Sequence, residues 1–548
     1  MKRLWLALVI GACGPLVGLA PASTLDTEMF GGGGNDSAMV CYLQPPYLYV
    51  AGNRNANFPV TVGAYSNAYP SSRDVFVAKL GMYDLAPLAI AVIGGSGDDE
   101  VTSLAFDSTG FVYVMGVTGS TNFPVTAGVY QTQKSGPTDL FVAKFDSSLS
   151  SLLAATYLGG SSNEYGVVTF GNGYLYLAGG SQSMDFPVSP DAYDTSFNGG
   201  SRDNFVARLD TALSQYRGSL FGGTSFSESA TEIRVALDGT VYVAGSTEGF
   251  GFPTTVGAVQ ATKSSFLGDG YISRFNSSLT ALLSSTLLGG QAGSGPDVCV
   301  SFDFDAQGNI LALFTASSAD FPITAGAFQA VKAGGAIDGA VSKLNPSLTA
   351  LLASTFIGSD GSDVPTHLRY DPRDDSVVVT LLSTTGFPMT TFAQSRNPSG
   401  NGDFVISRLN NALSVLLAST YLGGSGADRP ECVDINPVLG EIYVCGSSGS
   451  ANWPFAPNPT YSSFAGGTDA VVARLSPYLE SLGIQDVRQA GGLFTFTTYG
   501  QEGKTNVIQG SSDGSSWYVR TTYSQTNRVT TFSWTPPGDS SDLFRVVQ

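Results

Sequence analysis

Acidic side chains recur at one position of this sequence with regular spacing, and they are the residues best suited to chemistry. One follows each of seven glycine-rich steps: Asp36, Asp99, Glu164, Glu228, Asp297, Asp363 and Asp428. Carboxylate oxygens are the ligands that Ca²⁺ prefers, and a pair of carboxylic acids can hydrolyse a glycosidic bond. These seven residues are therefore candidate metal ligands, with Ca²⁺ as the cation they could hold and no other cofactor expected.

The same regularity also predicts a structural role for the seven acids. An acid at one position of every unit commonly caps a turn by accepting hydrogen bonds from backbone amides. A catalytic pair would break the sevenfold pattern, and no single pair of acids stands apart. We favour the structural role over cation or ligand contact, and both over catalysis, so no catalytic residue is assigned.

Other reactive side chains are scarce. His367 is the only histidine, it belongs to no catalytic motif, and we expect it to take no part in a Ser-His-Asp triad. Past the first 22 residues there are four cysteines, Cys41, Cys299, Cys432 and Cys445, without the close Cys pairs of a structural zinc site. Cys432 and Cys445 flank a predicted hairpin turn and could form a disulfide, with Cys41 as another partner. Buried free thiols are an equal alternative.

The acids belong to a unit of about 66 residues that occurs seven times. An aromatic–proline pair marks each copy: Phe58-Pro59, Phe123-Pro124, Phe186-Pro187, Phe252-Pro253, Phe321-Pro322, Phe387-Pro388 and Trp453-Pro454. Later in every copy an Asp opens an apolar run that ends in Lys or Arg, as in Asp139 to Lys144. We expect the aromatic residues to fill gaps between units, and the Asp and its basic partner to brace neighbouring units. A fixed period of this kind indicates a repeat architecture.

Each unit contains four strand signals, which are short apolar runs bounded by Gly, Asp or Ser. In the second unit they cover Val101 to Phe106, Phe111 to Gly116, Leu140 to Phe145 and Leu152 to Leu158. Four antiparallel strands repeated around an axis form a β-propeller blade. The sequence therefore predicts an all-β, seven-bladed propeller. An open solenoid would need polar caps, and seven separate sandwiches would need longer units.

The two ends of the repeat region indicate that the ring is closed. The last unit has its third strand at Ala470 to Leu475 but no strand after it, whereas Leu25 to Gly32 precedes the first unit and matches the missing strand. We predict that this N-terminal strand completes the seventh blade. Closure removes two exposed sheet edges that would favour aggregation.

The repeat has a recognisable signature. It reads Leu-Gly-Gly-Ser-Gly-x-Asp at Leu422 to Asp428, Asp-x-x-Gly-x-Val-Tyr-Val-x-Gly at Asp107 to Gly116, and then Phe-Pro. With these motifs the chain resembles the seven-bladed β-propeller repeat (SBBP repeat) proteins of bacterial exported and surface proteins, over roughly residues 25–483. The resemblance implies the fold and little about activity, because that family is defined by its repeat.

The segments outside the repeats predict export and a second domain. Residues 1–22 have the charged start, apolar run and Ala20-Pro21-Ala22 site of a signal peptide, so we expect a secreted or bacterial cell-surface protein. The alternative is a lipoprotein anchored through Cys13. The propeller is assigned to 23–483, and 484–548 resembles the small β-sandwich modules that end many bacterial exported proteins. There, Trp517 is expected to follow a turn and enter the core.

Charge and topology narrow the function. The net charge of −18 argues against nucleic acid as a partner, and no apolar run after the signal peptide is long enough for a transmembrane helix. The blade-to-blade connections and the loops between second and third strands should share one face, here called the loop-rich face. We predict a non-enzymatic binding or scaffold protein that uses this face for a protein, a glycan or a cell-surface component. The alternative is a carbohydrate-active enzyme, a glycosidase or lyase, using the acids there. The ligand and the oligomeric state stay open.

Overall fold

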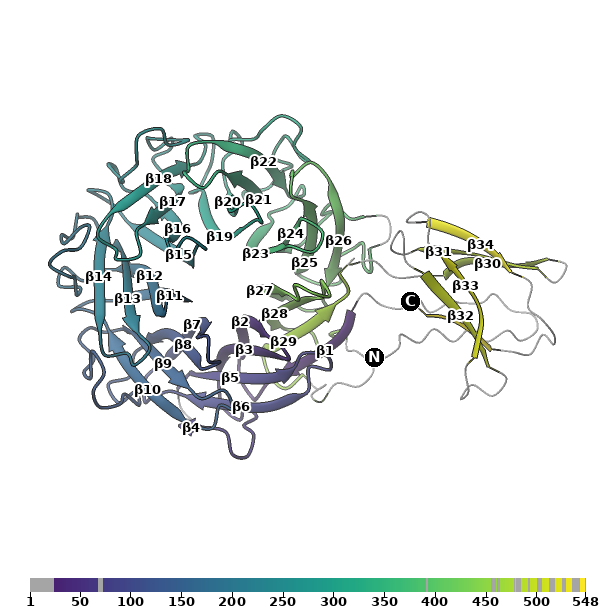
Figure 1. The fold of residues 1–548 in the computed structure, drawn as a ribbon, viewed down its shortest axis with the longest axis horizontal. Helices are drawn as coiled ribbons and strands as arrows, with labels where there is room; N and C mark the ends of the chain where they lie inside the picture. The colour runs from purple at the N-terminus through teal and green to yellow at the C-terminus, as the bar shows by residue number, and fades with distance from the viewer. Residues whose placement is uncertain are drawn as a thin grey trace.

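The computed structural model is a ring of seven β-sheets around a central axis (Figure 1). It describes residues 24–67, 72–390, 393–454, 460, 464–477 and 479, together with the backbone of six strands after residue 483. The all-β, seven-bladed propeller predicted from the repeat is confirmed. Within the described residues, no helix has the length and apolar character needed to cross a membrane.

Each blade is an antiparallel sheet whose strands run in chain order from the axis to the rim. Blade two consists of β7 (Asp99–Phe106), β8 (Val112–Thr118), β9 (Asp139–Phe145) and β10 (Leu152–Leu158). Its first strand lies at the axis and its fourth at the rim (Figure 1). The predicted strands of this unit agree with these bounds to within two residues, because alternating turn residues and β-branched or aromatic runs set both ends.

The other blades repeat this order. Blade one contains β2 (Ser37–Gln44), β3 (Tyr47–Arg54), β5 (Asp74–Gly81) and β6 (Pro87–Ile93), with the short β4 (Ser66–Asn67) added outside β6. Blade three contains β11 (Glu164–Gly171), β12 (Tyr174–Ser181), β13 (Asp203–Asp210) and β14 (Tyr216–Phe221). Blade four contains β15 (Glu228–Val235), β16 (Val241–Thr247), β17 (Asp269–Phe275) and β18 (Leu282–Leu288).

Blades five to seven complete the circle. Blade five contains β19 (Val298–Phe304), β20 (Ile310–Ala316), β21 (Asp338–Leu344) and β22 (Leu351–Ile357). Blade six contains β23 (Val364–Asp371), β24 (Ser376–Ser383), β25 (Asp403–Asn410) and β26 (Leu416–Leu422). Blade seven contains β27 (Asp428–Ile435), β28 (Ile442–Ser448), β29 (Asp469–Leu475) and, as its outer strand, β1 (Thr24–Phe30).

The ring is closed by the N-terminal strand, as predicted. Strand β1 pairs antiparallel with β29, with Phe30 opposite Ala470 and Asp26 opposite Arg474. Phe30 is fully buried, and the Arg474 Nε donates to the Asp26 carboxylate at 3.0 Å. The last blade therefore combines strands from both ends of the propeller sequence, and β29 is covered by an outer strand like the third strand of every other blade.

The aromatic–proline pairs form buried anchors between blades. Phe123 is 3% exposed, and its ring lies 4.4 Å from that of Phe141. Its backbone N–H donates to the Tyr157 hydroxyl, which in turn donates to the Ser120 carbonyl oxygen. The aromatic rings of the other six pairs are also buried, so their predicted role is confirmed.

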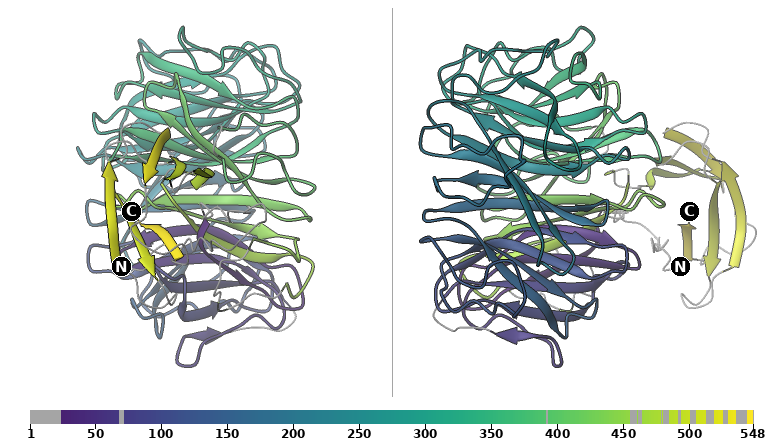
Figure 2. Two further views of the ribbon diagram at one scale, coloured as in Figure 1. Left: turned by 90° about the vertical axis from the view of Figure 1, so that its right-hand side faces the viewer. Right: turned by 60° about the vertical axis from the view of Figure 1, so that its left-hand side comes forward.

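Four of the seven basic residues at the ends of third strands brace the next blade, as expected: Lys79, Lys144, Arg208 and Lys343. The other three pair with carboxylates of their own blade instead: Arg274, Arg408 and Arg474. Lys79 Nζ donates to the Ser147 carbonyl oxygen at 2.9 Å, and Lys144 Nζ donates to that of Thr211 at 3.0 Å. These acceptors lie in the turn between the third and fourth strands of the following blade. Seen from the side, turns of this kind and the longer loops lie at the two opposite faces of the ring (Figure 2).

The C-terminal region forms two three-stranded sheets. One has the order β30 (Ile484–Ala490), β31 (Leu493–Tyr499), β34 (Val529–Trp534), and the other β33 (Tyr518–Ser524), β32 (Thr505–Ser511), β35 (Leu543–Val547). Their assignment to a sandwich-like module stays a prediction. Residues 1–23, with the predicted signal peptide and Cys13, and Trp517 lie outside the described residues.

Candidate functional site

The seven recurring acids lie in the blade-to-blade connections, buried beneath the loop-rich face. Each is at most 3% exposed: Asp36, Asp99, Glu164, Glu228, Asp297, Asp363 and Asp428. Asp99 shows the common arrangement, since its Oδ2 accepts the Gly95 N–H at 2.6 Å and the Ser120 hydroxyl at 2.9 Å. These carboxylates thus tie the glycine-rich step to the loop that follows the second strand.

A second buried carboxyl group lies beside the recurring acid at six of the blade junctions. It is the Asp that begins the third strand of the preceding blade. At each of these junctions burial raises the pKa of one member, and the charge of the other raises it further: Asp99 beside Asp74, Glu164 beside Asp139, Glu228 beside Asp203, Asp338 beside Asp363, Asp403 beside Asp428, and Asp469 beside Asp36. The sequence analysis assigned these third-strand aspartates only to bracing.

The junction between blades three and four has the most perturbed pair. Burial raises the pKa of Glu228 to about 8, against a Gly223 amide that lowers it, and Asp203 raises it further. Burial also raises the pKa of Asp203 to about 6. A Cβ at Gly222 would lie 3.0 Å from Asp203 Oδ1 and 3.4 Å from Glu228 Oε2. Neither of these oxygens has a hydrogen-bond partner among the described residues. The pair therefore retains a proton at neutral pH.

The structure does not bring the seven recurring acids together. Each stands in a different blade junction, and among the described residues no three His, Cys, Asp or Glu side chains are grouped to hold a metal ion. Their backbone hydrogen bonds account for the sevenfold recurrence. The cation role stays a prediction for each junction separately.

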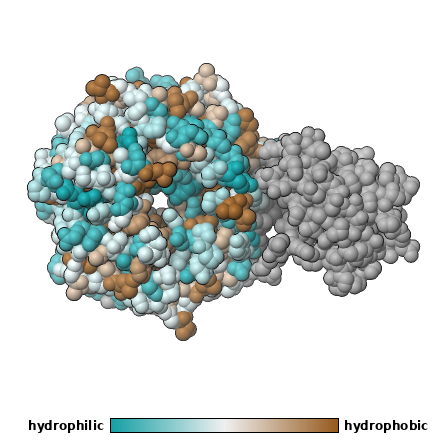
Figure 3. Space-filling model, viewed as in Figure 1, coloured by the Kyte–Doolittle hydropathy of each residue, from teal (hydrophilic) through white to brown (hydrophobic). Residues whose placement is uncertain are grey.

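A cavity of about 190 Å³ lies on the axis and is lined by the first strands of the blades. It is visible as the hollow at the centre of the ring (Figure 3). The residue four places after each recurring acid lines this axis or lies beside it: Val40, Ser103, Val168, Glu232, Ser301, His367 and Cys432. One register position of the repeat thus supplies a different side chain from each blade.

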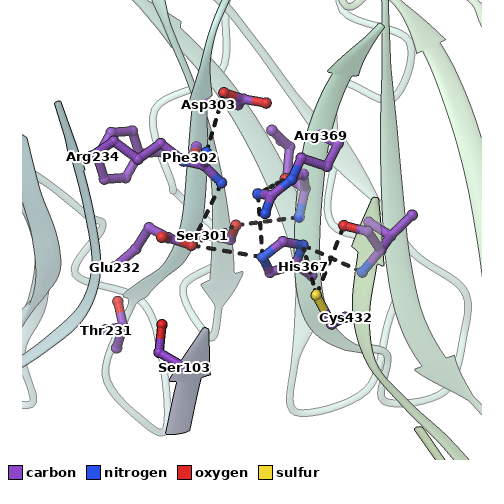
Figure 4. Close-up of polar contacts among 12 residues, drawn as sticks. Ser103, Thr231, Glu232, Arg234, Ser301, Phe302, Asp303, His367, Arg369 and Cys432 are labelled. Atoms are coloured by element: carbon purple, nitrogen blue, oxygen red, sulfur yellow. Dashed lines mark hydrogen bonds and ion pairs between the residues drawn. The ribbon is translucent and has the colours of Figure 1, made fainter. Parts of the chain in front are cut away.

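The position six places after the acid carries alternating charges in blades four to seven. Arg234 Nη1 lies 3.6 Å from Asp303 Oδ1, and Arg369 Nε lies 3.3 Å from Asp434 Oδ1. Arg234 also donates through Nε to the Phe302 carbonyl oxygen at 2.5 Å (Figure 4). Both guanidinium groups have carboxylate partners, so neither arginine presents an unpaired positive charge to the axial cavity.

The single histidine lies between a thiol and a carboxylate on this axis (Figure 4). His367 Nδ1 lies 3.9 Å from Cys432 Sγ, and His367 Nε2 lies 3.7 Å from Glu232 Oε2. Burial alone would lower the pKa of His367, but Cys432 and Glu232 raise it to about 10. Sequence reasoning missed this group because its members come from β23, β27 and β15. The shared register position is the signal that could have found it.

The four cysteines of the described chain are free and buried. Cys432 and Cys445 are directly opposite on β27 and β28, and Cys432 contacts the Cys41 carbonyl oxygen at 3.5 Å. The hairpin geometry predicted for Cys432 and Cys445 is therefore present, and the two remain thiols.

Phenylalanine side chains break the sevenfold pattern on the loop-rich face between blades three and four. Phe226, Phe250 and Phe266 are 55%, 43% and 84% exposed, and we call them, with Lys263, the phenylalanine patch. Ring centroids lie 6.0 Å apart for Phe226 and Phe250, and 5.8 Å apart for Phe250 and Phe266. Lys263 Nζ lies 4.5 Å above the Phe250 ring. Clustered exposed apolar side chains of this kind mark contact surfaces.

A longer blade connection produces the patch. Glu228 comes five places after Gly223, whereas Glu164 comes four places after Gly160 in the preceding copy, and Phe226 has a φ of +68° that non-glycine residues rarely adopt. The Thr224 N–H donates to the Phe250 carbonyl oxygen at 2.8 Å, which joins the two loops of the patch. The sequence analysis did not single out these phenylalanines, although aligning the seven units would have shown them at positions that hold small residues in most other copies.

Comparison with known proteins supports the repeat. The SBBP beta-propeller repeat family matches residues 91–124, and no curated protein matches the sequence. Raptor from Chaetomium thermophilum is 11% identical with a TM-score of 0.43, and the match covers 82% of this chain but only 29% of Raptor. The quinohemoprotein alcohol dehydrogenase ADHIIG from Pseudomonas putida HK5 is 8% identical with a TM-score of 0.37, covering 86% and 78% of the two chains.

A polysaccharide lyase, an ulvan lyase, is 9% identical with a TM-score of 0.38, and the match covers 74% of this chain and 92% of the lyase. At these scores the likenesses say nothing about activity. The chain is thus a seven-bladed β-propeller that carries the SBBP beta-propeller repeat.

Proposed function

We propose that this protein is an exported, non-enzymatic binding propeller that holds a partner protein against the phenylalanine patch of its loop-rich face. The observation that carries the proposal is the departure from sevenfold symmetry between blades three and four, where three clustered aromatic rings are exposed. Aromatic side chains are enriched at the centres of protein interfaces, where a few of them supply most of the binding energy.

The surroundings of the patch favour an apolar segment of a protein over a glycan. Two polar side chains nearby, Thr224 and Ser264, are already engaged within the propeller. The Thr224 hydroxyl donates to the Phe250 carbonyl oxygen at 3.3 Å, and the Ser264 hydroxyl donates to Asp269 and to the Gly290 carbonyl oxygen. A sugar would require free hydrogen-bonding groups around the rings, whereas an aromatic or aliphatic anchor requires only the rings.

The carbohydrate-active alternative has less support. Two acids that cleave a glycosidic bond must reach the substrate, and the recurring acids are buried below the loops. Their main-chain hydrogen bonds also give each of them a structural role that is repeated in all blades. Export and surface location rest on the predicted signal peptide and are part of the same proposal.

A displayed library of random peptides tests the patch. Peptides selected on the intact protein should carry an aromatic or aliphatic anchor. Replacing Phe226, Phe250 and Phe266 together by Ser should weaken their binding about tenfold or more, measured by interferometry. The matched control is Leu237→Ser, which changes a fully exposed side chain in the β15–β16 turn, at the opposite face of the same blade.

Three results would contradict the proposal. Peptides that bind the triple variant as tightly as the intact protein would show that the patch is not the contact. Binding on a glycan array that depends on the three phenylalanines would replace the protein partner by a sugar. A dimer in sedimentation at micromolar concentration that the triple substitution abolishes would make a second copy the occupant.

A further inference from the structure

Cys432 combines three features that ordinary buried cysteines lack. It lines the axial cavity, its Sγ lies 3.9 Å from His367 Nδ1, and it is directly opposite a second thiol, Cys445. His367 is in turn flanked by Glu232 at 3.7 Å on its other nitrogen (Figure 4). A thiol, a base and a group that orients the base form the arrangement that activates nucleophilic cysteines.

We propose that Cys432 is a nucleophilic thiol of the axial cavity, activated by His367, which reacts with small disulfides and is then resolved by Cys445. This site is independent of the phenylalanine patch. Its substrate class is a low-molecular-weight disulfide that enters along the axis.

The groups around His367 define its role. Because its pKa is raised to about 10, His367 carries the proton of Cys432 at neutral pH, and the pair rests as a thiolate and an imidazolium with Nδ1 facing Sγ. Glu232 then stabilises the imidazolium through Nε2. Arg369 lies 3.4 Å from the same Nε2, but its charge is held by Asp434. In unliganded sites such contacts are commonly longer than in the reacting complex.

The reaction balances without any further reagent. His367 holds the Cys432 proton, and the thiolate attacks one sulfur of the disulfide RSSR, forming a mixed disulfide and expelling RS⁻, which takes the proton from His367. The Cys445 sulfur then attacks the Cys432 sulfur and expels the second RS⁻, which takes the Cys445 proton. Two protein thiols are oxidised to one disulfide, and RSSR is reduced to two RSH.

The strand geometry permits the second step. Opposite residues of an antiparallel pair have Cα atoms about 4.5–5.5 Å apart, within the range that a disulfide spans. Cys432 also packs in one buried cluster with Cys41 and Cys445. Hydrogen bonds from Cys41 and Cys445, followed by the charge of His367, hold the pKa of Cys432 well below its usual range.

Cys299 provides a matched control within the same molecule. It is also free and fully buried in a first strand, but no histidine contacts it and burial raises the pKa of its thiol. Cys299 does not line the axial cavity, so the difference in reactivity between the two cysteines measures access and activation together, and His367→Gln isolates the part due to activation.

The experiment treats the folded full chain with bis(2-hydroxyethyl) disulfide at pH 6 to 8, quenches with acid, and locates modified cysteines by peptide mass mapping. Cys432 should react about tenfold or more faster than Cys299, and a Cys432–Cys445 disulfide should follow. In His367→Gln the Cys432 rate should fall about tenfold and its pH profile should move up to that of an ordinary thiol. In Cys445→Ser the reaction should stop at the mixed disulfide.

The comparison of Cys432 with Cys299 in the unaltered protein keeps the test decisive even where a variant does not fold. Equal slow rates for the two cysteines in the folded protein would overturn the proposal. So would a folded His367→Gln protein whose Cys432 reacts as fast as before. In urea both cysteines should react at the same rate, and a persisting difference there would also refute the role of the folded site.

Discussion

Glu228→Gln should make the propeller more stable at mildly alkaline pH. The unfolded chain releases the Glu228 proton near its ordinary pKa of 4.5, whereas the folded protein holds it to about pH 8 because the carboxyl group is buried beside Asp203. Between these values the unfolded state binds fewer protons, so stability falls as pH rises, by up to about 1.4 kcal/mol per pH unit. Over the whole window the loss of folding stability amounts to roughly 4–5 kcal/mol, and part of this loss comes from the charge repulsion between Glu228 and Asp203.

Glutamine keeps the acceptor for Gly223 and offers an N–H where the retained proton stood, without titrating. Urea unfolding of the two proteins, followed by fluorescence at pH 5, 6, 7 and 8, checks the expectation. The curves should agree to within about 1 kcal/mol at pH 5, and the variant should be more stable by roughly 2–5 kcal/mol at pH 8. Glu100→Gln, which alters an exposed glutamate, is the control and should change little.

Parallel pH dependences of the intact protein and Glu228→Gln would refute the reasoning, because Glu228 would then be ionised in the folded state across the window. The same inference extends to other junctions. Burial raises the pKa of Glu164 to about 7 and those of Asp99, Asp338 and Asp403 to about 6. The whole propeller should accordingly lose stability between about pH 5 and pH 8.

Three further changes test the fold. Deleting Leu25–Gly32 removes β1 and exposes the edge of β29, so it should cost about 3–6 kcal/mol and cause aggregation, read by light scattering during melting; a deletion that melts like the intact protein would contradict ring closure. Phe123→Ala should cost about 3–5 kcal/mol in urea unfolding, and a loss below 1 kcal/mol would argue against its anchoring role. Gly116→Ala places a Cβ 1.9 Å from the Glu100 carbonyl oxygen and should lower the melting temperature well below that of Gly33→Ala, whose Cβ would meet only Asn57 Nδ2 at 3.7 Å.

The fold could be predicted because every unit repeats the same local signals. The Phe123-Pro124 pair, the acid at Asp99 and the turn at Asp107 recur in register, so errors in one copy are corrected by the others. Ring closure was also predictable. The last unit lacks its fourth strand, and an extra strand with the matching sequence precedes the first unit. Only strand ends differ, as in β8, which continues to Thr118 because Thr118 still pairs with Asp139.

The sites could be predicted only in part, because they depend on contacts between blades. Asp203 and Glu228 each belong to a regular pattern, but only the packing of blade three on blade four makes them one carboxyl pair. Glu232, His367 and Cys432 are far apart in the sequence and meet because their blades share an axis. A sequence pattern gives the register position of such residues, whereas curvature of the ring decides which of them touch.

Repetition and function place opposite demands on the same positions. A position that serves the blade, such as the acid that accepts the Gly95 N–H, has to be kept in every copy because each turn needs it. A position that serves a ligand needs to differ in one or two blades only, since a ligand breaks the sevenfold symmetry. We propose that the axial position occupied by His367 and Cys432, and the lengthened loop that carries Phe226, are of this second kind. In a propeller of near-identical units, a position where one blade carries a different side chain from the others is therefore a better guide to function than a residue that recurs in every blade.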